Sequence, residues 1–163
     1  FVGKMSVEKG ALEAIRIARK TGVALDVVGG LIDGEANRYS KLVEECCTGR
    51  IKFWGNVTDE EKIKLMQTAK AIIYPVGQLE IHSHKSVEAM LCGCPVITWD
   101  CGALREVIGT GGAAVVTESA FIHEMSAEWD RELTRAWAMQ WDRPVRVEAV
   151  LKLLEEVAGG KKW

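Results

Sequence analysis

Short apolar runs alternate with longer segments of helical periodicity along nearly the whole chain. The runs span four to six residues, as expected for strands that are buried on both faces. In the longer segments apolar residues recur every three or four positions, which is typical of helices that pack one face on a sheet. The alternation predicts an α/β fold. We expect a Rossmann-like, doubly wound parallel sheet of about six strands with helices on both faces.

The boundaries of the predicted elements follow from local signals. Thr58 precedes three acidic residues and is a typical helix N-cap, Ser83 can cap a short helix, and Gly93 can end it. The predicted strands are a segment ending at Gly3 and residues 24–28, 51–54, 71–74, 95–98 and 113–116. The predicted helices are residues 7–21, 35–47, 59–69, 84–92, 103–108, 126–139 and 145–157.

Composition indicates a soluble protein with one domain over residues 1–163. Of its residues, 48% are hydrophobic and 27% are charged, which provides for a sizeable core. The formal net charge of −2 gives no broad basic surface, so we expect no nucleic-acid partner. No apolar run approaches the roughly 20 residues of a membrane helix, and we expect a cytoplasmic protein. Phe1–Gly3 resembles the end of a buried strand, so we interpret the chain as an excised part of a longer protein.

The cysteines indicate neither a disulfide framework nor a metal site. Their number, five, is odd, and most lie in predicted helices or strands, so we expect reduced thiols. Cys92 and Cys94 lie near His82 and His84 in the sequence, but no second cysteine pair follows at the spacing of a zinc site. We therefore predict no metal.

Ligands of parallel α/β sheets bind at the carboxyl ends of the strands. The loops after Gly3, Val28, Trp54, Tyr74 and Thr98 should therefore share one rim of the sheet. No Gly-x-Gly-x-x-Gly follows the first predicted strand and no P-loop motif is present, which argues against dinucleotide and P-loop sites.

The first candidate site lies after Gly3, where Lys4 and Lys9 leave a strand end and enter a helix. Ammonium groups and the amides of a helix N-terminus both favour an anion, so these lysines are candidates to bind a diphosphate. Two solvated surface lysines are the alternative interpretation.

The second candidate site is a pair of glutamates. Glu80 lies in the predicted loop after the fourth strand, and Glu88 lies in the helix that follows. Carboxylates accept hydrogen bonds, and two of them can bind the vicinal hydroxyls of a ribose or a hexose. The amides of His84, Lys85 and Ser86 at the helix start could bind a phosphate between the two sugars. Glutamates on a solvated face are the alternative, but apolar residues follow Glu88 directly.

The third candidate site is the turn at Gly102, within residues 100–106. It could bring backbone amides close to a sugar, or it could be an ordinary connection between strand and helix. His82 and His84 could act as acid or base, although surface histidines beside a helix cap are more common.

Together and in this order, these motifs resemble the nucleotide-sugar-binding, C-terminal half of the group 1 (family 4) glycosyltransferases of the GT-B fold. Residues 3–10 are similar to the family's Gly-Arg-x-x-x-x-Lys-Gly. Residues 51–61 are similar to its Phe-x-Gly-x-Val-x-Asp-Glu-Glu segment. Residues 80–97 are similar to its signature of two glutamates separated by seven residues, followed by Ala-Met-x-x-Gly-x-Pro-Val-Ile. Residues 100–106 resemble its Gly-Gly-x-x-Glu turn.

The resemblance implies a role for each matching residue. Lys4 and Lys9 would neutralise the diphosphate of the donor, and Glu88 would bind the ribose hydroxyls. Glu80, as the catalytic residue, would contact the donor hexose near the reacting carbon. The remaining donor-binding residues would be Gly3, Val57, His84, Lys85, Ser86 and Gly102.

The resemblance also implies the reaction. The family transfers sugars with retention of the anomeric configuration and without a metal, so the expected co-substrate is a UDP-, GDP- or ADP-linked sugar and no cofactor is needed. The acceptor, a carbohydrate or a lipid-linked molecule, would bind the missing N-terminal domain of the same chain. We therefore expect the isolated domain to be inactive, and we expect any peripheral membrane contact to involve only the missing half.

The chain departs from the family pattern at three places. Lys4 replaces the usual arginine, and residues 81–83 replace Pro-Phe-Gly. Ala103 replaces the second glycine of the last turn, which narrows the space for the backbone. These differences leave the identity of the donor open. Two other functions also stay open: a nucleotide-sugar epimerase or hydrolase of the same fold, which would need an acid or base among the histidines, and a non-catalytic nucleotide-sugar-binding module.

Overall fold

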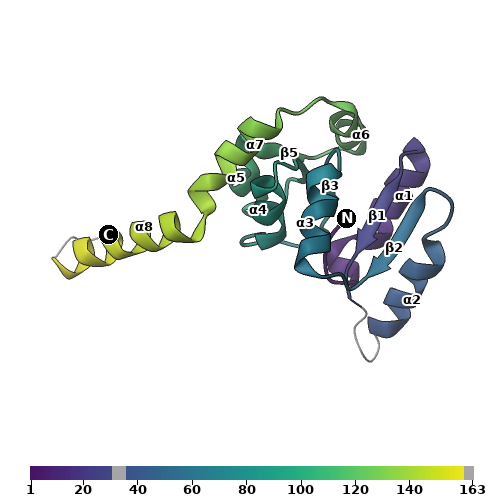
Figure 1. Ribbon diagram of the computed structural model, residues 1–163, viewed down its shortest axis with the longest axis horizontal. Coiled ribbons are helices and arrows are strands. Elements are labelled where there is room, and N and C mark those ends of the chain that lie inside the picture. Colours follow the sequence, from purple (N-terminus) through teal and green to yellow (C-terminus); the bar gives the residue numbers. More distant parts are fainter. Residues whose placement is uncertain (31–35, 160–163) are drawn as a thin grey trace.

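The structure, a computed structural model, describes residues 1–30 and 36–159. Over these residues the chain forms an α/β fold of parallel strands and helices, which confirms the predicted class (Figure 1). The described strands form two sheets. In the first sheet β1 (Leu25–Val28) pairs with β2 (Ile51–Gly55). In the second the order is β3 (Ile72–Tyr74), β4 (Val96–Trp99) and β5 (Gly112–Val115).

The prediction of one sheet of about six strands was wrong. The segment that ends at Gly3 forms only an isolated bridge, between Val2 and Val28. Its hydrogen bonds run from Gly3 N–H to the Val28 carbonyl and from Val28 N–H to the Phe1 carbonyl, each at 2.9 Å. Phe1 also reaches the second sheet, because its ring lies 6.5 Å from that of Tyr74. Residues 1–3 therefore make a single bridge to β1. Within the described chain they form no ladder of strand hydrogen bonds with β3.

An apolar groove of about 190 Å³ lies where the two sheets meet. Residues at the starts of β1 and β3 line it together with residues of the third helix, among them Leu25, Leu65 and Ile72. The lining thus comes largely from the starts of these strands, whereas the sequence predicts the site at their carboxyl ends.

The described helices are α1 (Ala11–Thr21), α2 (Ala36–Cys46), α3 (Asp59–Thr68), α4 (His84–Leu91), α5 (Leu104–Ile108), α6 (Glu118–Ser126), α7 (Arg131–Ala138) and α8 (Arg143–Ala158). Single 3₁₀ turns occupy residues 7–9, 109–111 and 139–141. The α1 helix contacts both β1 and β3, whereas α6 contacts β4 and β5. Side chains from both sheets share one buried core, which includes Val27, Ile97 and Phe121.

Two predicted helix starts are confirmed by their caps. The Thr58 hydroxyl accepts the N–H of Glu61 at 3.2 Å, and the Glu61 carboxylate accepts the N–H of Thr58 at 2.9 Å. This capping box fixes the start of α3. At α4 the Ser83 hydroxyl accepts the N–H of Ser86.

Two other helix predictions need correction. The predicted helix over residues 7–21 is divided at Gly10, whose φ of 77° is left-handed. The predicted helix over residues 126–139 is replaced by α6 and α7. Thr117 and Asp130 cap these helices by accepting backbone N–H groups. The two caps, and not the apolar pattern alone, set the boundaries.

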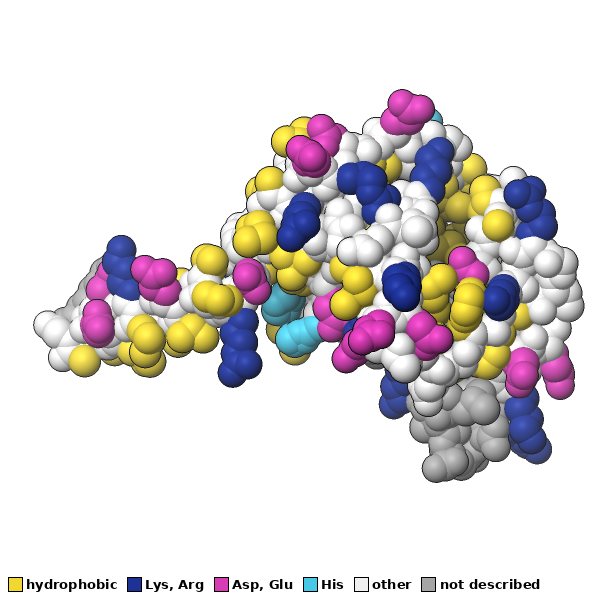
Figure 2. Space-filling model, in the orientation of Figure 1, with side chains coloured by type: hydrophobic (Ala, Val, Ile, Leu, Met, Phe, Trp, Pro, Cys, Tyr) yellow, Lys and Arg dark blue, Asp and Glu magenta, His cyan; other side chains and the backbone are white. Residues whose placement is uncertain are grey.

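The last helix, α8, projects from the body of the molecule, and apolar side chains lie open along it (Figures 1 and 2). None of its residues is buried. Its large exposed apolar side chains are Val145, Val147, Val150, Leu151, Leu153, Leu154 and Val157. Neither α8 nor any other helix in the described parts of the chain combines the length and apolarity needed to cross a membrane.

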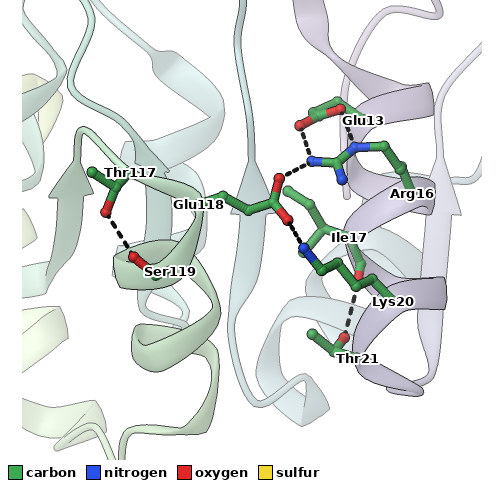
Figure 3. A network of polar contacts seen from close by, with 8 residues as sticks. All are labelled: Glu13, Arg16, Ile17, Lys20, Thr21, Thr117, Glu118 and Ser119. Carbon is green, nitrogen blue, oxygen red and sulfur yellow. Dashed lines mark hydrogen bonds and ion pairs between the residues drawn. The ribbon is translucent and has the colours of Figure 1, made fainter.

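A polar network joins α6 to α1 on the surface (Figure 3). The Glu118 carboxylate accepts hydrogen bonds from Arg16 and Lys20, each at 2.5 Å. Glu13 holds the other side of the Arg16 guanidinium at 2.7 and 2.8 Å. Hydrogen bonds from Arg16 and Lys20 lower the pKa of Glu118 to about 2. The network thus connects the helix beside β1 to a helix on the second sheet.

Replacement of Glu118 by glutamine should lower the thermal unfolding midpoint at neutral pH, because the charge that pairs with Arg16 and Lys20 is lost. Since the folded-state pKa of Glu118 lies below its ordinary value of about 4.5, its contribution is present above about pH 4.5 and is lost as the pH falls toward about 2. The difference between Glu118→Gln and wild type should therefore shrink over that range. Circular dichroism melts measure it.

Glu124→Gln is the matched control, because it removes a carboxylate from the same helix that makes no ion pair with the described residues. Equal effects of the two substitutions at neutral pH would contradict a specific role of the network.

Candidate functional site

Three connections meet at the carboxyl ends of the strands: the lysine loop (residues 3–10), the glutamate loop (residues 75–83) and the glycine turn (residues 100–103). The Gly77 N–H in the glutamate loop donates to the Glu8 carbonyl in the lysine loop at 2.9 Å. The glycine turn joins from the other side, where the Ala103 N–H donates to the Glu80 carbonyl at 2.8 Å. The glutamate loop is therefore held on both flanks by backbone hydrogen bonds.

Two glycines allow the loops to approach this closely. Gly102 has a φ of 64°, and a Cβ on it would lie 2.2 Å from the Glu80 carbonyl oxygen. Gly10 has a φ of 77°, and a Cβ on it would lie 2.1 Å from the Pro75 carbonyl oxygen. A larger residue at either position would strain the backbone and push the glutamate loop away.

Glu80 is the most enclosed of the charged residues predicted for the site, with 9% of its surface exposed. Its Oε1 accepts a hydrogen bond from Lys9 Nζ and another, of 3.1 Å, from the hydroxyl of Tyr74. Burial lowers the pKa of Lys9, but hydrogen bonds to Glu80 and Tyr74 outweigh it, so the pKa is raised and the lysine stays charged. The structure thus brings the first two predicted motifs together through an ion pair.

Glu88 points to different partners. Its Oε2 lies 3.2 Å from Nζ of Lys62 and 3.2 Å from Nζ of Lys85. Lys62 belongs to α3 and also pairs with Asp59 at 2.8 Å, and these hydrogen bonds to Asp59 and Glu88 raise its pKa. Glu80 and Glu88 therefore share no hydrogen-bonding partner among the described residues, although they flank the same helix start.

The start of α4 lies between the two glutamates. The N–H of Ser86 is used by the Ser83 cap at 3.3 Å, whereas no described residue accepts the N–H of His84 or Lys85. The ring of His84 is exposed and lies 5.0 Å from that of His82. Burial lowers the pKa of His82, with smaller contributions from nearby His84 and Arg146, which favours its neutral form.

The other predicted donor-binding residues lie on the same rim. Gly3 continues the bridge to β1, and the Lys4 side chain is exposed and makes no ion pair with the described residues. Val57 is half-buried after β2. Beside it, Asn56 packs so closely on Gly30 that a Cβ there would lie 2.4 Å from the amide oxygen.

Sequence reasoning missed Tyr74 and Lys62. Tyr74 ends a strand of buried residues, so its place suggested a core side chain, and nothing local indicates that its hydroxyl reaches Glu80. Lys62 is three positions after Asp59 on a helix, which indicates a surface ion pair but not the bond to Glu88.

Across residues 1–30 and 36–159, no three His, Cys, Asp or Glu side chains are grouped so as to hold a metal ion. Of the cysteine pair near the histidines, Cys94 is buried, and this burial raises the pKa of its thiol to about 11.

Comparison with known proteins relates the chain to sugar-transferring enzymes. A family model described as glycosyl transferases group 1 matches residues 1–131. The 2-deoxystreptamine glucosyltransferase of Streptomyces kanamyceticus is 25% identical over 167 residues, which cover 100% of this chain and 39% of that protein.

Two solved structures have a similar fold. AviGT4, a glycosyltransferase involved in avilamycin A biosynthesis, has a TM-score of 0.81 and 21% identity, covering 100% of this chain and 52% of that one. HepE of Anabaena in complex with UDP has a TM-score of 0.76 and 22% identity, covering 95% of this chain and 47% of that one. The chain thus spans about half, or less, of the length of these proteins.

Replacement of Gly102 by alanine should destabilise the protein more than the same change at Gly22. Both residues have a left-handed φ, 64° and 69°, but a Cβ at Gly22 meets no atom within 4 Å. We expect Gly22→Ala to cost about 1 kcal/mol through backbone strain alone. Gly102→Ala should cost about 1–3 kcal/mol more, because it must also displace Glu80. Urea unfolding measures both, and equal costs would contradict the close approach.

Proposed function

Because the chain belongs to the group 1 glycosyltransferases, we propose that it binds the nucleotide-diphospho-sugar donor from which the complete protein transfers a hexosyl group. The observation that carries this proposal is the bond between Lys9 and Glu80. This ion pair brings an ammonium group, which can bind phosphate, next to a carboxylate, which can bind sugar hydroxyls, at the point where the three loops meet. The acceptor is a carbohydrate or a lipid-linked molecule in this proposal.

Lys9 is the main contact for the diphosphate. Its side chain is 25% exposed and charged, so a phosphate can reach it from solvent. The N–H groups of His84 and Lys85, which no described residue accepts, supply further donors at the positive end of a helix. Lys4 adds an exposed positive charge from the same loop.

The two glutamates bind the two sugars. Glu80, next to Lys9, accepts hydrogen bonds from hexose hydroxyls near the reacting carbon. Glu88, on the α3 side of α4, accepts the ribose hydroxyls. Its present partners are Lys62 and Lys85, and they can shift to make room because the side chain of Lys85 is flexible and partly exposed. Val57, Gly3 and Gly102 border the donor through their backbones.

The chemistry follows from the charges. The reaction releases a nucleoside diphosphate, and Lys9, Lys4 and the helix amides stabilise the negative charge that develops on it. We therefore propose a metal-independent transfer with retention of configuration. The acceptor site belongs to the part of the complete protein outside this chain.

The relatives support the choice of donor for a first test. One is named a glucosyltransferase, and HepE has been crystallised with UDP and with UDP-glucose. UDP-glucose is therefore the first probe, followed by GDP- and ADP-linked sugars.

Substitution of Glu88 by glutamine should weaken UDP binding about tenfold, because a charged acceptor of the ribose hydroxyls is lost. The same substitution should have little effect on 2′,3′-dideoxyuridine diphosphate, which lacks those hydroxyls. Isothermal titration calorimetry of the two ligands measures the difference.

Glu60→Gln is the matched control, since Glu60 is an exposed α3 carboxylate without an ion pair to the described residues. An equal loss of affinity for both ligands in Glu88→Gln would show that Glu88 acts through charge or folding and not on the ribose.

The 163-residue chain should bind UDP-glucose, with or without EDTA, but should not transfer glucose, because the acceptor site is elsewhere. The complete protein should transfer it. Binding is measured by saturation-transfer NMR, and transfer by release of UDP with a panel of sugar acceptors. Transfer by the chain alone would refute the proposal that this chain binds the donor and another part of the complete protein binds the acceptor. Donor binding without transfer by the complete protein would indicate a non-catalytic binding module.

A further inference from the structure

The hydroxyl of Tyr74 reaches the proposed donor site from the core. Tyr74 is the last residue of β3 and is 4% exposed. Its carbonyl accepts the Thr98 hydroxyl at 2.6 Å, and its own hydroxyl donates to Glu80 Oε1 at 3.1 Å. The backbone and the ring of Tyr74 are both fixed, so its hydroxyl is held at a defined position on the core side of Glu80.

Both donors to Glu80 bind the same oxygen. Lys9 Nζ and the Tyr74 hydroxyl each donate to Oε1, whereas Oε2 accepts no hydrogen bond from the described residues. With Oε1 held from the protein side, Oε2 is the oxygen left to accept a sugar hydroxyl. A carboxylate fixed through one oxygen presents the other in a single direction.

The proposed function makes two demands on Lys9. It pairs with Glu80 in the present structure, and it binds the diphosphate when the donor enters. Every bond that Lys9 gives to phosphate weakens its bond to Glu80. Without the Tyr74 hydroxyl, a carboxylate as buried as Glu80 would then lack a donor on Oε1, which is costly in a protein interior.

We propose that Tyr74 is a positioning residue that retains Oε1 of Glu80 when Lys9 turns to the diphosphate, so that Oε2 stays directed at the donor sugar. This inference rests on the proposed function. Tyr74 does not touch the donor itself.

The chemistry of Tyr74 suits this role. Burial is the main cause that raises the pKa of its hydroxyl, so the group keeps its proton and can donate. Phenylalanine would preserve the ring, including its contact with Phe1 at 6.5 Å between centroids, and would remove only the donor. The chain has one other tyrosine, Tyr39, whose hydroxyl accepts the N–H of Leu12 at 3.2 Å and makes no hydrogen bond to Glu80 among the described residues. Tyr39→Phe is therefore a matched control for the loss of a hydroxyl.

The test compares UDP-glucose with UDP, because only UDP-glucose carries the hexose that Glu80 contacts. We expect Tyr74→Phe to weaken UDP-glucose binding about tenfold and UDP binding by clearly less, because UDP also draws Lys9 away from Oε1 but carries no hexose for Oε2 to hold. Tyr39→Phe should leave both affinities unchanged. Calorimetry on the 163-residue chain measures the affinities, and circular dichroism checks the fold of each variant.

A double-mutant cycle with Glu80→Gln separates positioning from general destabilisation. If Tyr74 acts through the Glu80 carboxylate, Tyr74→Phe should add no further loss of UDP-glucose affinity in the Glu80→Gln background. Additive losses, or an equal loss for UDP and UDP-glucose, would overturn the proposal.

A spectroscopic measurement tests the same idea without changing Tyr74. In the Tyr39→Phe chain labelled with carbon-13 at tyrosine Cζ, Tyr74 gives the only tyrosine signal. UDP should shift this signal, because Lys9 leaves Oε1 and the hydroxyl becomes its main donor. An unchanged signal at saturating UDP would overturn the proposal and leave the donor-binding function intact. Failure of the wild-type chain to bind UDP-, GDP- or ADP-linked sugars would instead refute the proposed function, and the role of Tyr74 with it.

Discussion

The arrangement of the candidate site depends on Glu80, which is fixed through both its backbone and its side chain. Its carbonyl accepts the N–H of Ala103 from the glycine turn, and its carboxylate accepts Lys9 from the lysine loop. Tyr74 holds the same carboxylate from below. Glu80 thus joins the lysine loop, about 70 positions before it in the sequence, to the glycine turn, about 20 positions after it. Because both donors bind Oε1, either one alone still satisfies this oxygen, whereas removal of both would leave a buried carboxylate oxygen without a partner.

The same constraint explains why charge is balanced in the site before a ligand arrives. Each glutamate of the pair is matched by lysine, Glu80 by Lys9 and Glu88 by Lys62 and Lys85. The cations and carboxylates that would bind phosphates and hydroxyls therefore satisfy one another in the free protein. Ligand binding must exchange these bonds for new ones, so the affinity of the site depends on the difference between the two sets and not on the number of contacts. A neutral donor such as Tyr74 lowers the cost of that exchange, because it does not follow the phosphate.

Local signals in the sequence were sufficient for the class of fold and for the meeting of the loops that carry the candidate residues. The caps at Thr58 and Ser83, the parallel class and the shared rim of loops all depend on a few neighbouring residues. The division into two sheets was not predictable in this way, because it depends on whether the segment at Val2 meets partners on both sides. The contacts of Tyr74 with Glu80 and of Lys62 with Glu88 also arise from the packing of separate elements. A strand of buried residues predicts that Tyr74 is in the core, and it is, but the pattern contains no information about which acceptor its hydroxyl reaches.

The division into two sheets has a consequence for the site. The lysine loop continues from the segment that bridges to β1, whereas the glutamate loop and the glycine turn follow strands of the second sheet. No ladder of strand hydrogen bonds joins the two sheets within the described chain, so their relative position depends on other contacts. These include the shared buried core, the packing of α1 on β3, the Gly77 to Glu8 hydrogen bond and the Glu118 network on the surface. The bond between Lys9 and Glu80 spans the same junction. A ligand whose diphosphate is held by Lys9 and whose sugar is held by Glu80 would therefore bridge the two sheets, and its binding energy would add to the contacts that hold them in register.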